Sequence, residues 1–424
     1  MRPVLTNVER ARAYMRDAGI DAVIAGAPTN VRYLSGYSCW LEPLFKEFMV
    51  EPGGSGAIAQ RSYCLYPFEG DPCLVVEPLW AVDALGTWVE DVRTPSLADA
   101  AAATPDLHLP RDIERILGML GRTGAATDAL SILVEAVLER GLGSSRIGVE
   151  LEGLPAHLQE VLAHRLPSAK LLDCTNLLRL VRAVKSPGEI EQLARSASIS
   201  EAAALTALAS ISPGDPVSAS VQVFRTHAAA EGADMDHFTF GLYGLGIVTG
   251  GGRPLPAGQA LYCDFGCIHE GWFSDSGTTY CLGEPSPEAL AGHEAVVASV
   301  EAGAALLRPG VHGSIVQAAM QDALAERGIV ASFPHGHGLG VAVRDYPILM
   351  PDSGGVIRDD CVEVPADLPL EPNMVVNLEA PVFVPGSHSV HCERSFVVTE
   401  DDARPLVPQE RTEPVVGVMQ RAVR

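Results

Sequence analysis

The stretch that decides the fold is residues 260–275, which read ALYCDFGCIHEGWFSD. Its two apolar halves are separated by a short polar turn around His269 and Glu270, which is the pattern of a β-hairpin. If the turn is centred between these two residues, Asp264 stands opposite Asp275 with the Cβ atoms about 5 Å apart. Facing carboxylates in an apolar sheet repel each other, so a shared proton, an arginine or a metal ion must neutralise them.

A second hairpin repeats this arrangement. Residues 375–379 read VVNLE and residues 391–398 read HCERSFVV, and the turn at 385–387 places Glu379 opposite Glu393. Between the two hairpins, residues 334–340 read PHGHGLG, where the glycines let the backbone approach a neighbour closely and present an imidazole. Four carboxylates and one imidazole suit a pair of Mn, Fe, Co or Zn ions. Such a pair activates water and polarises a carbonyl, which is hydrolytic chemistry.

The order of these residues resembles that of the pita-bread metallohydrolases, which include aminopeptidase P, prolidase and creatinase. The resemblance implies two divalent metal ions, with Mn as the first expectation and Fe, Co or Zn as alternatives. It also implies that Asp275 and Glu393 bridge the ions, that Glu379 handles the proton of the attacking water, and that the chain forms a homodimer. The implied metal ligands are Asp264, Asp275, His337, Glu379 and Glu393.

The N-terminal part of the chain differs in character from the part that carries the hairpins. Residues 1–180 alternate helical and strand-like stretches, which is typical of an α/β domain, and residues 19–24 (GIDAVI) and 30–37 (NVRYLSGY) are similar to the start of the family's first domain. Near the boundary, Ser186 can cap a helix that begins with Pro187. We predict an α/β creatinase-like N-terminal domain over 1–180 and an α+β pita-bread catalytic domain over 181–424.

Two departures from proline peptidases concern the groups that grip the substrate. Position 344 is arginine where these enzymes usually carry a histidine, seven positions after the ligand histidine, and residues 248–254 (VTGGGRP) lack their upstream histidine. A fixed cation favours a carboxylate, so we predict that Arg344 and its neighbour Tyr346 bind substrate. An ion pair of Arg344 with Asp345 or another neighbour is the alternative.

Four further residues are candidates for the site. His391 alternates with Glu393 on its strand and shares its face, so we predict a catalytic role for it beside Glu379. His335, two positions before His337, is either structural or a substrate contact. His237 lies where the family lines its pocket, with a place in the core as the alternative. Trp40 belongs to an aromatic-rich segment that reaches the partner's active site in family dimers, with core packing as the alternative.

Composition excludes several kinds of partner. With 30 Lys and Arg against 53 Asp and Glu, the formal charge of −23 repels nucleic acids and anionic membrane surfaces. The sequence has no stretch of transmembrane length, and residues 1–9 lack the apolar core of a secretory signal. Nine cysteines are scattered singly, which favours a reduced, cytoplasmic location.

These features together predict a cytoplasmic dinuclear-metal hydrolase that cleaves a C–N bond next to a carboxylate-bearing group. An Xaa-Pro peptide bond is the first expectation, so the substrate is a short peptide or another small molecule, and neither a nucleic acid nor a membrane is a partner. A specialised non-peptide C–N hydrolase or lyase on the same centre is the second interpretation. A non-catalytic binding module is the third, and it is disfavoured because uncompensated buried carboxylates are costly.

Overall fold

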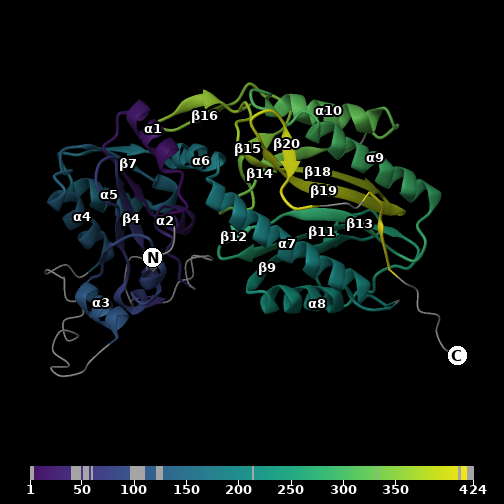
Figure 1. Ribbon diagram of the computed structural model, residues 1–424, viewed down its shortest axis with the longest axis horizontal. Helices are drawn as coiled ribbons and strands as arrows, with labels where there is room; N and C mark the ends of the chain where they lie inside the picture. Colours follow the sequence, from purple (N-terminus) through teal and green to yellow (C-terminus); the bar gives the residue numbers. More distant parts are fainter. Residues whose placement is uncertain are drawn as a thin grey trace. The chain divides into compact units, whose positions relative to one another are not determined.

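The structure is a computed structural model that describes residues 4–39, 49–50, 57–58, 61–95, 110–120, 128–212, 214–330, 332–408 and 412–417. The chain divides into two compact units. The first consists of Met1–Val181 with Ile357–Glu363, and the second consists of Arg182–Val356 with Val364–Arg424. The predicted order of an α/β part followed by an α+β part is confirmed (Figure 1).

The first unit is built on a six-stranded mixed sheet. Its strands, in spatial order, are β6 (Asp91–Arg93), β5 (Cys73–Val75), β4 (Tyr63–Pro67), β1 (Ala22–Ala25), β7 (Arg146–Val149) and β8 (Lys170–Asp173). All four residues of β1 are buried, as expected for an uninterrupted apolar run in the middle of a sheet. Its helices are α1 (Val8–Ala18), α2 (Pro28–Ser35), α3 (Arg111–Leu120), α4 (Ala129–Glu139), α5 (Ala156–Arg165) and α6 (Thr175–Ala183), the last of which ends beyond the boundary.

Several short elements complete the described chain. They are the strand pair β2 (Met49–Val50) and β3 (Ala57–Ile58), the 3₁₀ helices η2 (Pro78–Trp80), η3 (Asp83–Gly86) and η5 (Leu151–Gly153), and the strand pair β16 (Val356–Arg358) and β17 (Glu363–Pro365).

The second unit is built on an eleven-stranded sheet in which most neighbouring strands are antiparallel. Its main path is β10 (Ile247–Val248), β9 (Ala233–Gly241), β11 (Ala260–His269), β13 (Ser276–Leu282), β19 (His388–Val398), β18 (Val375–Val384), β14 (His335–Gly338) and β15 (Asp345–Leu349). Three short strands pair with it at the side: β12 (Trp272–Phe273), β20 (Ala403–Pro405) and β21 (Val415–Gly417). Its helices are α7 (Pro187–Ala209), α8 (Val217–Ala230), α9 (Pro287–Ala304) and α10 (Gly313–Ala325).

Two helix pairs cover one face of this sheet and leave the other for polar side chains. Cys263 and Phe265 of β11 belong to the apolar cluster that includes α7 and α8, whereas Leu378 of β18 and Cys392 of β19 belong to the cluster that includes α9 and α10 (Figure 1). Successive side chains of a strand point to opposite faces. Asp264 and its counterparts on the other strands therefore stand on the face away from the helices.

The two hairpins differ in how well the sequence predicts their register. Glu379 pairs directly with Glu393, as predicted. The prediction for the first hairpin is wrong, because Asp264 pairs with Gly277 and not with Asp275. The turn is formed by Glu270 and Gly271, both with positive φ (47° and 78°), and it is centred between these two residues rather than one position earlier. Two successive residues of positive φ are typical of the tight turns that join antiparallel strands.

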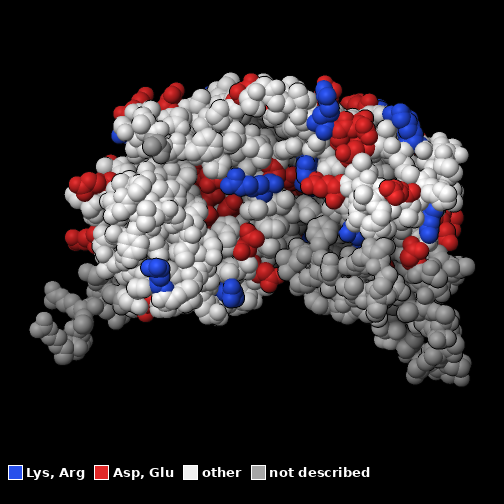
Figure 2. Space-filling view, turned by 180° about the vertical axis from the view of Figure 1, so that it is seen from behind, with Lys and Arg blue, Asp and Glu red and all other residues white. Residues whose placement is uncertain are grey.

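The described helices and the visible surface add two observations. None of the helices in the described part of the chain combines the length and apolar character needed to cross a membrane. On the face shown in Figure 2, the Lys and Arg side chains stand singly or in small groups among Asp and Glu.

Candidate metal centre

The structure brings the five predicted ligands together on the polar face of the second unit's sheet. Asp264 comes from β11, Asp275 from the link between β12 and β13, His337 from β14, Glu379 from β18 and Glu393 from β19. Two more histidines, His237 and His391, join them. Their ligand atoms form three groups, each within 4.8 Å: His237, Asp264 and Asp275; Asp275, His337 and Glu393; Glu379, His391 and Glu393.

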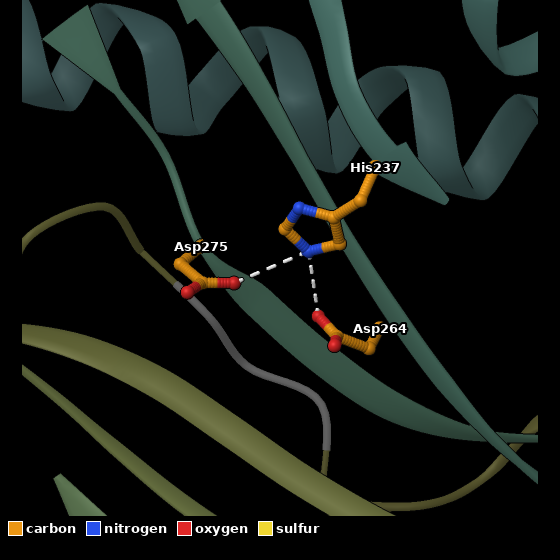
Figure 3. A group of neighbouring side chains, drawn as sticks. All are labelled: His237, Asp264 and Asp275. Carbon is orange, nitrogen blue, oxygen red and sulfur yellow. Dashed lines mark hydrogen bonds and ion pairs between the residues drawn. The ribbon is translucent and has the colours of Figure 1, made fainter. Parts of the chain in front are cut away.

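His237 lies between two carboxylates at one end of the centre. Its Nε2 atom is 2.8 Å from Oδ1 of Asp264 and 3.3 Å from Oδ1 of Asp275. Figure 3 shows both side chains pointing toward the imidazole. Burial alone would lower the pKa of His237, but its partners Asp236 and Asp264 raise it to about 12. The prediction for His237 was a substrate contact or a core residue, and its position directly against two predicted ligands was missed.

His337 is oriented for coordination. Its Nδ1 atom lies 3.0 Å from the carbonyl oxygen of Gly338, which can only accept, so Nδ1 carries the proton and Nε2 carries a lone pair. The Nε2 atom is 3.5 Å from Oδ2 of Asp275 and 3.9 Å from Oε1 of Glu379. This atom is fully buried and has no hydrogen-bond partner among the described residues.

Glu393 is buried beside other carboxylates of the centre. One oxygen, Oε1, accepts a 2.9 Å hydrogen bond from Nδ2 of Asn377, whereas Oε2 has no hydrogen-bond partner in the described part of the chain. Burial, and then repulsion from Asp275 and Asp264, raises the pKa of Glu393 well above its ordinary value.

This donor set fits a pair of divalent cations. Uncompensated buried charges are costly, and two divalent ions balance four carboxylates. The unpaired Nε2 of His337 and Oε2 of Glu393 are the kind of atoms that a cation would satisfy.

Glu379 is held by two donors on the open side of the centre. Nε2 of His335 lies 2.6 Å from its Oε1 atom, and Nη2 of Arg344 lies 3.0 Å from the same oxygen. Burial would raise the pKa of Glu379, but the hydrogen bond from His335 and its charge lower it below the ordinary value. The pKa of His335 is correspondingly raised, although its burial acts in the opposite direction.

Arg344 forms an ion pair with Glu379 and not with Asp345, so the alternative of an ion pair with a neighbour is observed, with Glu379 rather than Asp345 as the partner. The side chain of Arg344 is 54 % exposed, whereas that of Glu379 is 8 % exposed, which leaves the guanidinium open to solvent. Tyr346 is half-buried and packs against the apolar cluster of α9 and α10. Trp40, the remaining substrate-binding candidate, lies outside the described residues.

Asp345 anchors the backbone beside Arg344. Its carboxylate is buried and accepts two hydrogen bonds from Arg182, from Nε at 3.1 Å and from Nη2 at 3.0 Å. Burial would raise the pKa of Asp345, but the charges of Arg182 and Lys185 lower it below its ordinary value. The ion pair therefore contributes stability above the unfolded-state pKa of about 3.9, and this contribution is lost as the pH falls through the lowered folded-state pKa.

We predict that Arg182→Met lowers the free energy of unfolding by about 3–5 kcal/mol at pH 7, because a buried carboxylate loses its partner. The loss should shrink below about pH 4, where Asp345 becomes protonated in the variant and in the unfolded chain. Urea unfolding followed by tryptophan fluorescence at several pH values measures both effects. Arg195→Met, which removes an ion pair with Glu231 whose two side chains are about half-exposed, is the control and should cost less than about 1 kcal/mol. Equal losses for the two variants would contradict the prediction.

Two residues that support the centre were not predicted from the sequence. The hydroxyl of Tyr262 donates a 2.7 Å hydrogen bond to Oδ2 of Asp264, and Asn377 donates to Glu393. Each lies two positions from an acid on its own strand, so strand alternation places it on the ligand face. That spacing was the signal available in the sequence.

Comparisons with known proteins agree with this geometry. Residues 191–400 match the sequence model of metallopeptidase family M24, and residues 7–184 match that of the creatinase/prolidase N-terminal domain. The chain is 28 % identical over 335 residues to a probable dipeptidase, PepE, of Mycobacterium tuberculosis. The aligned part covers 73 % of this chain and 82 % of that protein. It is 26 % identical over 277 residues to the uncharacterized peptidase YqhT of Bacillus subtilis, covering 62 % of this chain and 73 % of the relative.

Solved structures support the same fold. The Xaa-Pro dipeptidase from Bacillus anthracis matches with a TM-score of 0.71 at 19 % identity, covering 96 % of this chain and 98 % of that one. The prolidase from Pyrococcus horikoshii matches with a TM-score of 0.69 at 18 % identity, covering 95 % and 98 %. The predicted fold class, an α/β creatinase-like domain followed by a pita-bread domain, is thereby confirmed.

Proposed function

Because the chain belongs to metallopeptidase family M24 and carries a creatinase/prolidase N-terminal domain, we propose that it is a dinuclear-metal peptidase that cleaves short peptides with an Xaa-Pro bond. One observation carries this proposal. The five predicted ligands lie close together, and two of their buried atoms, Nε2 of His337 and Oε2 of Glu393, have no hydrogen-bond partner in the described part of the chain. The curated relatives and solved neighbours named as dipeptidases and prolidases favour the same substrate class.

In this proposal the five predicted ligands would hold two divalent ions, and Asp275 and Glu393 each belong to two of the three groups of candidate ligand atoms. Mn is the first expectation for the oxygen-rich part of the set, and Fe, Co and Zn are the alternatives. When bound, such ions lower the pKa of water and polarise the scissile carbonyl. The metal ligands proposed are Asp264, Asp275, His337, Glu379 and Glu393.

Glu379 is the proposed general base. Its carboxylate accepts the proton of the attacking water and passes it to the leaving amine of proline. The imidazole of His335, whose Nε2 atom lies 2.6 Å from Oε1 of Glu379, keeps this carboxylate ionised. Arg344, whose guanidinium is exposed, is placed to pair with the C-terminal carboxylate of a dipeptide.

One observation favours a second candidate function. Proline peptidases usually have a histidine where this chain has Arg344, and residues 248–254 contain no histidine. These changes alter the residues that bind the scissile carbonyl in proline peptidases, whereas all five predicted metal ligands are present. The second candidate is therefore a hydrolase or lyase that acts on another small carboxylate-bearing molecule at the same centre.

The proposed domain boundary lies at residues 180 and 181, and we further propose a homodimer that acts in the cytoplasm. All nine cysteines lie in the described part of the chain and none of them forms a disulfide bond there, which supports a reducing compartment. Analytical ultracentrifugation measures the oligomeric state.

We predict that the protein loaded with Mn, Co, Fe or Zn releases proline from Xaa-Pro dipeptides. Assays on a panel of Xaa-Pro dipeptides, with metal content determined in parallel, test this proposal. Hydrolysis of the panel supports the peptidase. Full metal loading without cleavage of any member supports the second candidate, and failure to bind any of the four metals contradicts both and favours a binding module.

A further inference from the structure

His391 has an unsatisfied nitrogen that faces the metal ligands. The ring is completely buried on β19, and its Nδ1 atom lies 3.2 Å from the carbonyl oxygen of Cys263. A carbonyl can only accept, so Nδ1 carries the proton and Nε2 carries a lone pair. The Nε2 atom is 3.7 Å from Oε2 of Glu393, and neither atom has a hydrogen-bond partner among the described residues.

This arrangement places two acceptor atoms face to face, and a shared cation would satisfy both of them. A distance of 3.7 Å is too long for a hydrogen bond, and the lone pair of a neutral imidazole is repelled by a carboxylate oxygen. By contrast, two ligand atoms that share one ion at about 2.1 Å each are held about 3–4 Å apart. The ligand atoms of Glu379, His391 and Glu393 all lie within 4.8 Å of one another, which is compatible with a shared ion.

The neighbouring strand makes room for the ring. Gly277 on β13 lies opposite Glu393, and a Cβ atom at this position would overlap Cε1 and Nδ1 of His391. A glycine inside a strand weakens it and often marks a close approach of another group. On another side the ring of Tyr262 stacks on the imidazole, with centroids 4.0 Å apart and planes 21° apart. Three contacts, from Cys263, Gly277 and Tyr262, therefore fix the orientation of the ring.

We infer that His391 is a sixth protein ligand, whose Nε2 atom binds the cation held by Glu379 and Glu393. The inference rests on the proposed dinuclear centre. It specifies the role predicted for His391 as coordination of a metal ion. A neutral imidazole adds no charge, so four carboxylates remain balanced by two divalent ions. Because imidazole is a softer ligand than carboxylate, this position should favour Co and Zn over Mn more strongly than the five-ligand set does.

The test compares metal binding by the full-length wild type and the variants His391→Ala and His391→Gly. Isothermal titration with Mn and with Co yields two affinities, and the absorption spectrum of the Co-loaded protein reports the ligand set. We expect His391→Ala to weaken binding of one ion at least about tenfold, with a larger loss for Co than for Mn, and to leave the other ion nearly unchanged. Added free imidazole should restore the Co spectrum in His391→Gly.

Two further variants separate coordination from folding. His227→Gln removes an imidazole from α8 of the same unit, on the helix-covered side of the sheet, and it should leave both affinities unchanged. Gly277→Ala displaces the ring and should weaken the same ion as His391→Ala.

Unchanged affinities and an unchanged Co spectrum in His391→Ala would overturn the inference, while the proposed function would stand as long as the wild type binds two ions and cleaves its substrate. A wild type that binds neither Mn nor Co would overturn both.

Discussion

Replacing Asp275 with asparagine should lower kcat/KM by at least about 1,000-fold on any substrate that the wild type cleaves, because both ions of the proposed centre would depend on this carboxylate. Its Oδ1 atom lies 3.3 Å from Nε2 of His237 and its Oδ2 atom 3.5 Å from Nε2 of His337, and it belongs to two of the three ligand groups. Asparagine offers one oxygen in place of two, and its amide hydrogens would face a cation. A water molecule that loses contact with a metal ion has a much higher pKa and is a much weaker nucleophile at neutral pH.

The measurement combines steady-state kinetics with metal analysis of the purified variant, and at least one ion should be lost. Asp322→Asn on α10 is the matched control, since it removes an exposed carboxylate of the same unit and should leave both properties unchanged. A variant of Asp275 that keeps two ions and wild-type turnover would show that the centre does not depend on a bridging carboxylate at this position.

The sequence correctly predicted the pairing of Glu379 with Glu393 but not the register of the first hairpin. Glu379 and Glu393 are paired as predicted because the turn at Gly386 lies at the midpoint between them. The first hairpin was misregistered because the positive-φ turn of Glu270 and Gly271 was not recognised, which moved the predicted partner of Asp264 by two residues. Asp275 still reaches the centre, since its side chain extends from the link before β13.

The histidines show a second limit of sequence reasoning. No secondary structure was predicted from the sequence for the glycine-rich segment around His335. In the structure this segment forms strand β14, so His335 and His337 share a face and both approach Glu379. The contact of His391 with Gly277 joins strands more than a hundred residues apart, and no local pattern indicates it. Alternation along a strand is readable from sequence, but which glycine accommodates which ring is a property of the assembled sheet.

Replacing Arg344 with alanine should raise KM about 10–100-fold for a dipeptide with a free C-terminal carboxylate and change kcat less than about threefold. A hydrogen bond between charged groups contributes about 1.5–3 kcal/mol, and each 1.4 kcal/mol is a factor of ten. The side chain of Arg344 is 54 % exposed, and its partner in the structure, Glu379, would share its charge with a bound ion. The pairing with Glu379 is then weakened, which frees the guanidinium for the carboxylate of the substrate.

A C-terminally amidated dipeptide is the matched probe, because it lacks the carboxylate and should be cleaved equally by the wild type and by Arg344→Ala. Lysine at this position keeps the positive charge but cannot form the two parallel hydrogen bonds of a guanidinium. The KM of Arg344→Lys should therefore lie between those of the wild type and Arg344→Ala. If Arg344 serves Glu379 instead, kcat should fall for both substrates. The acidic limb of the pH profile should then move to higher pH, since removing a cation raises the pKa of the carboxylate beside it. The split between KM and kcat therefore decides whether this arginine recognises the substrate or tunes the base.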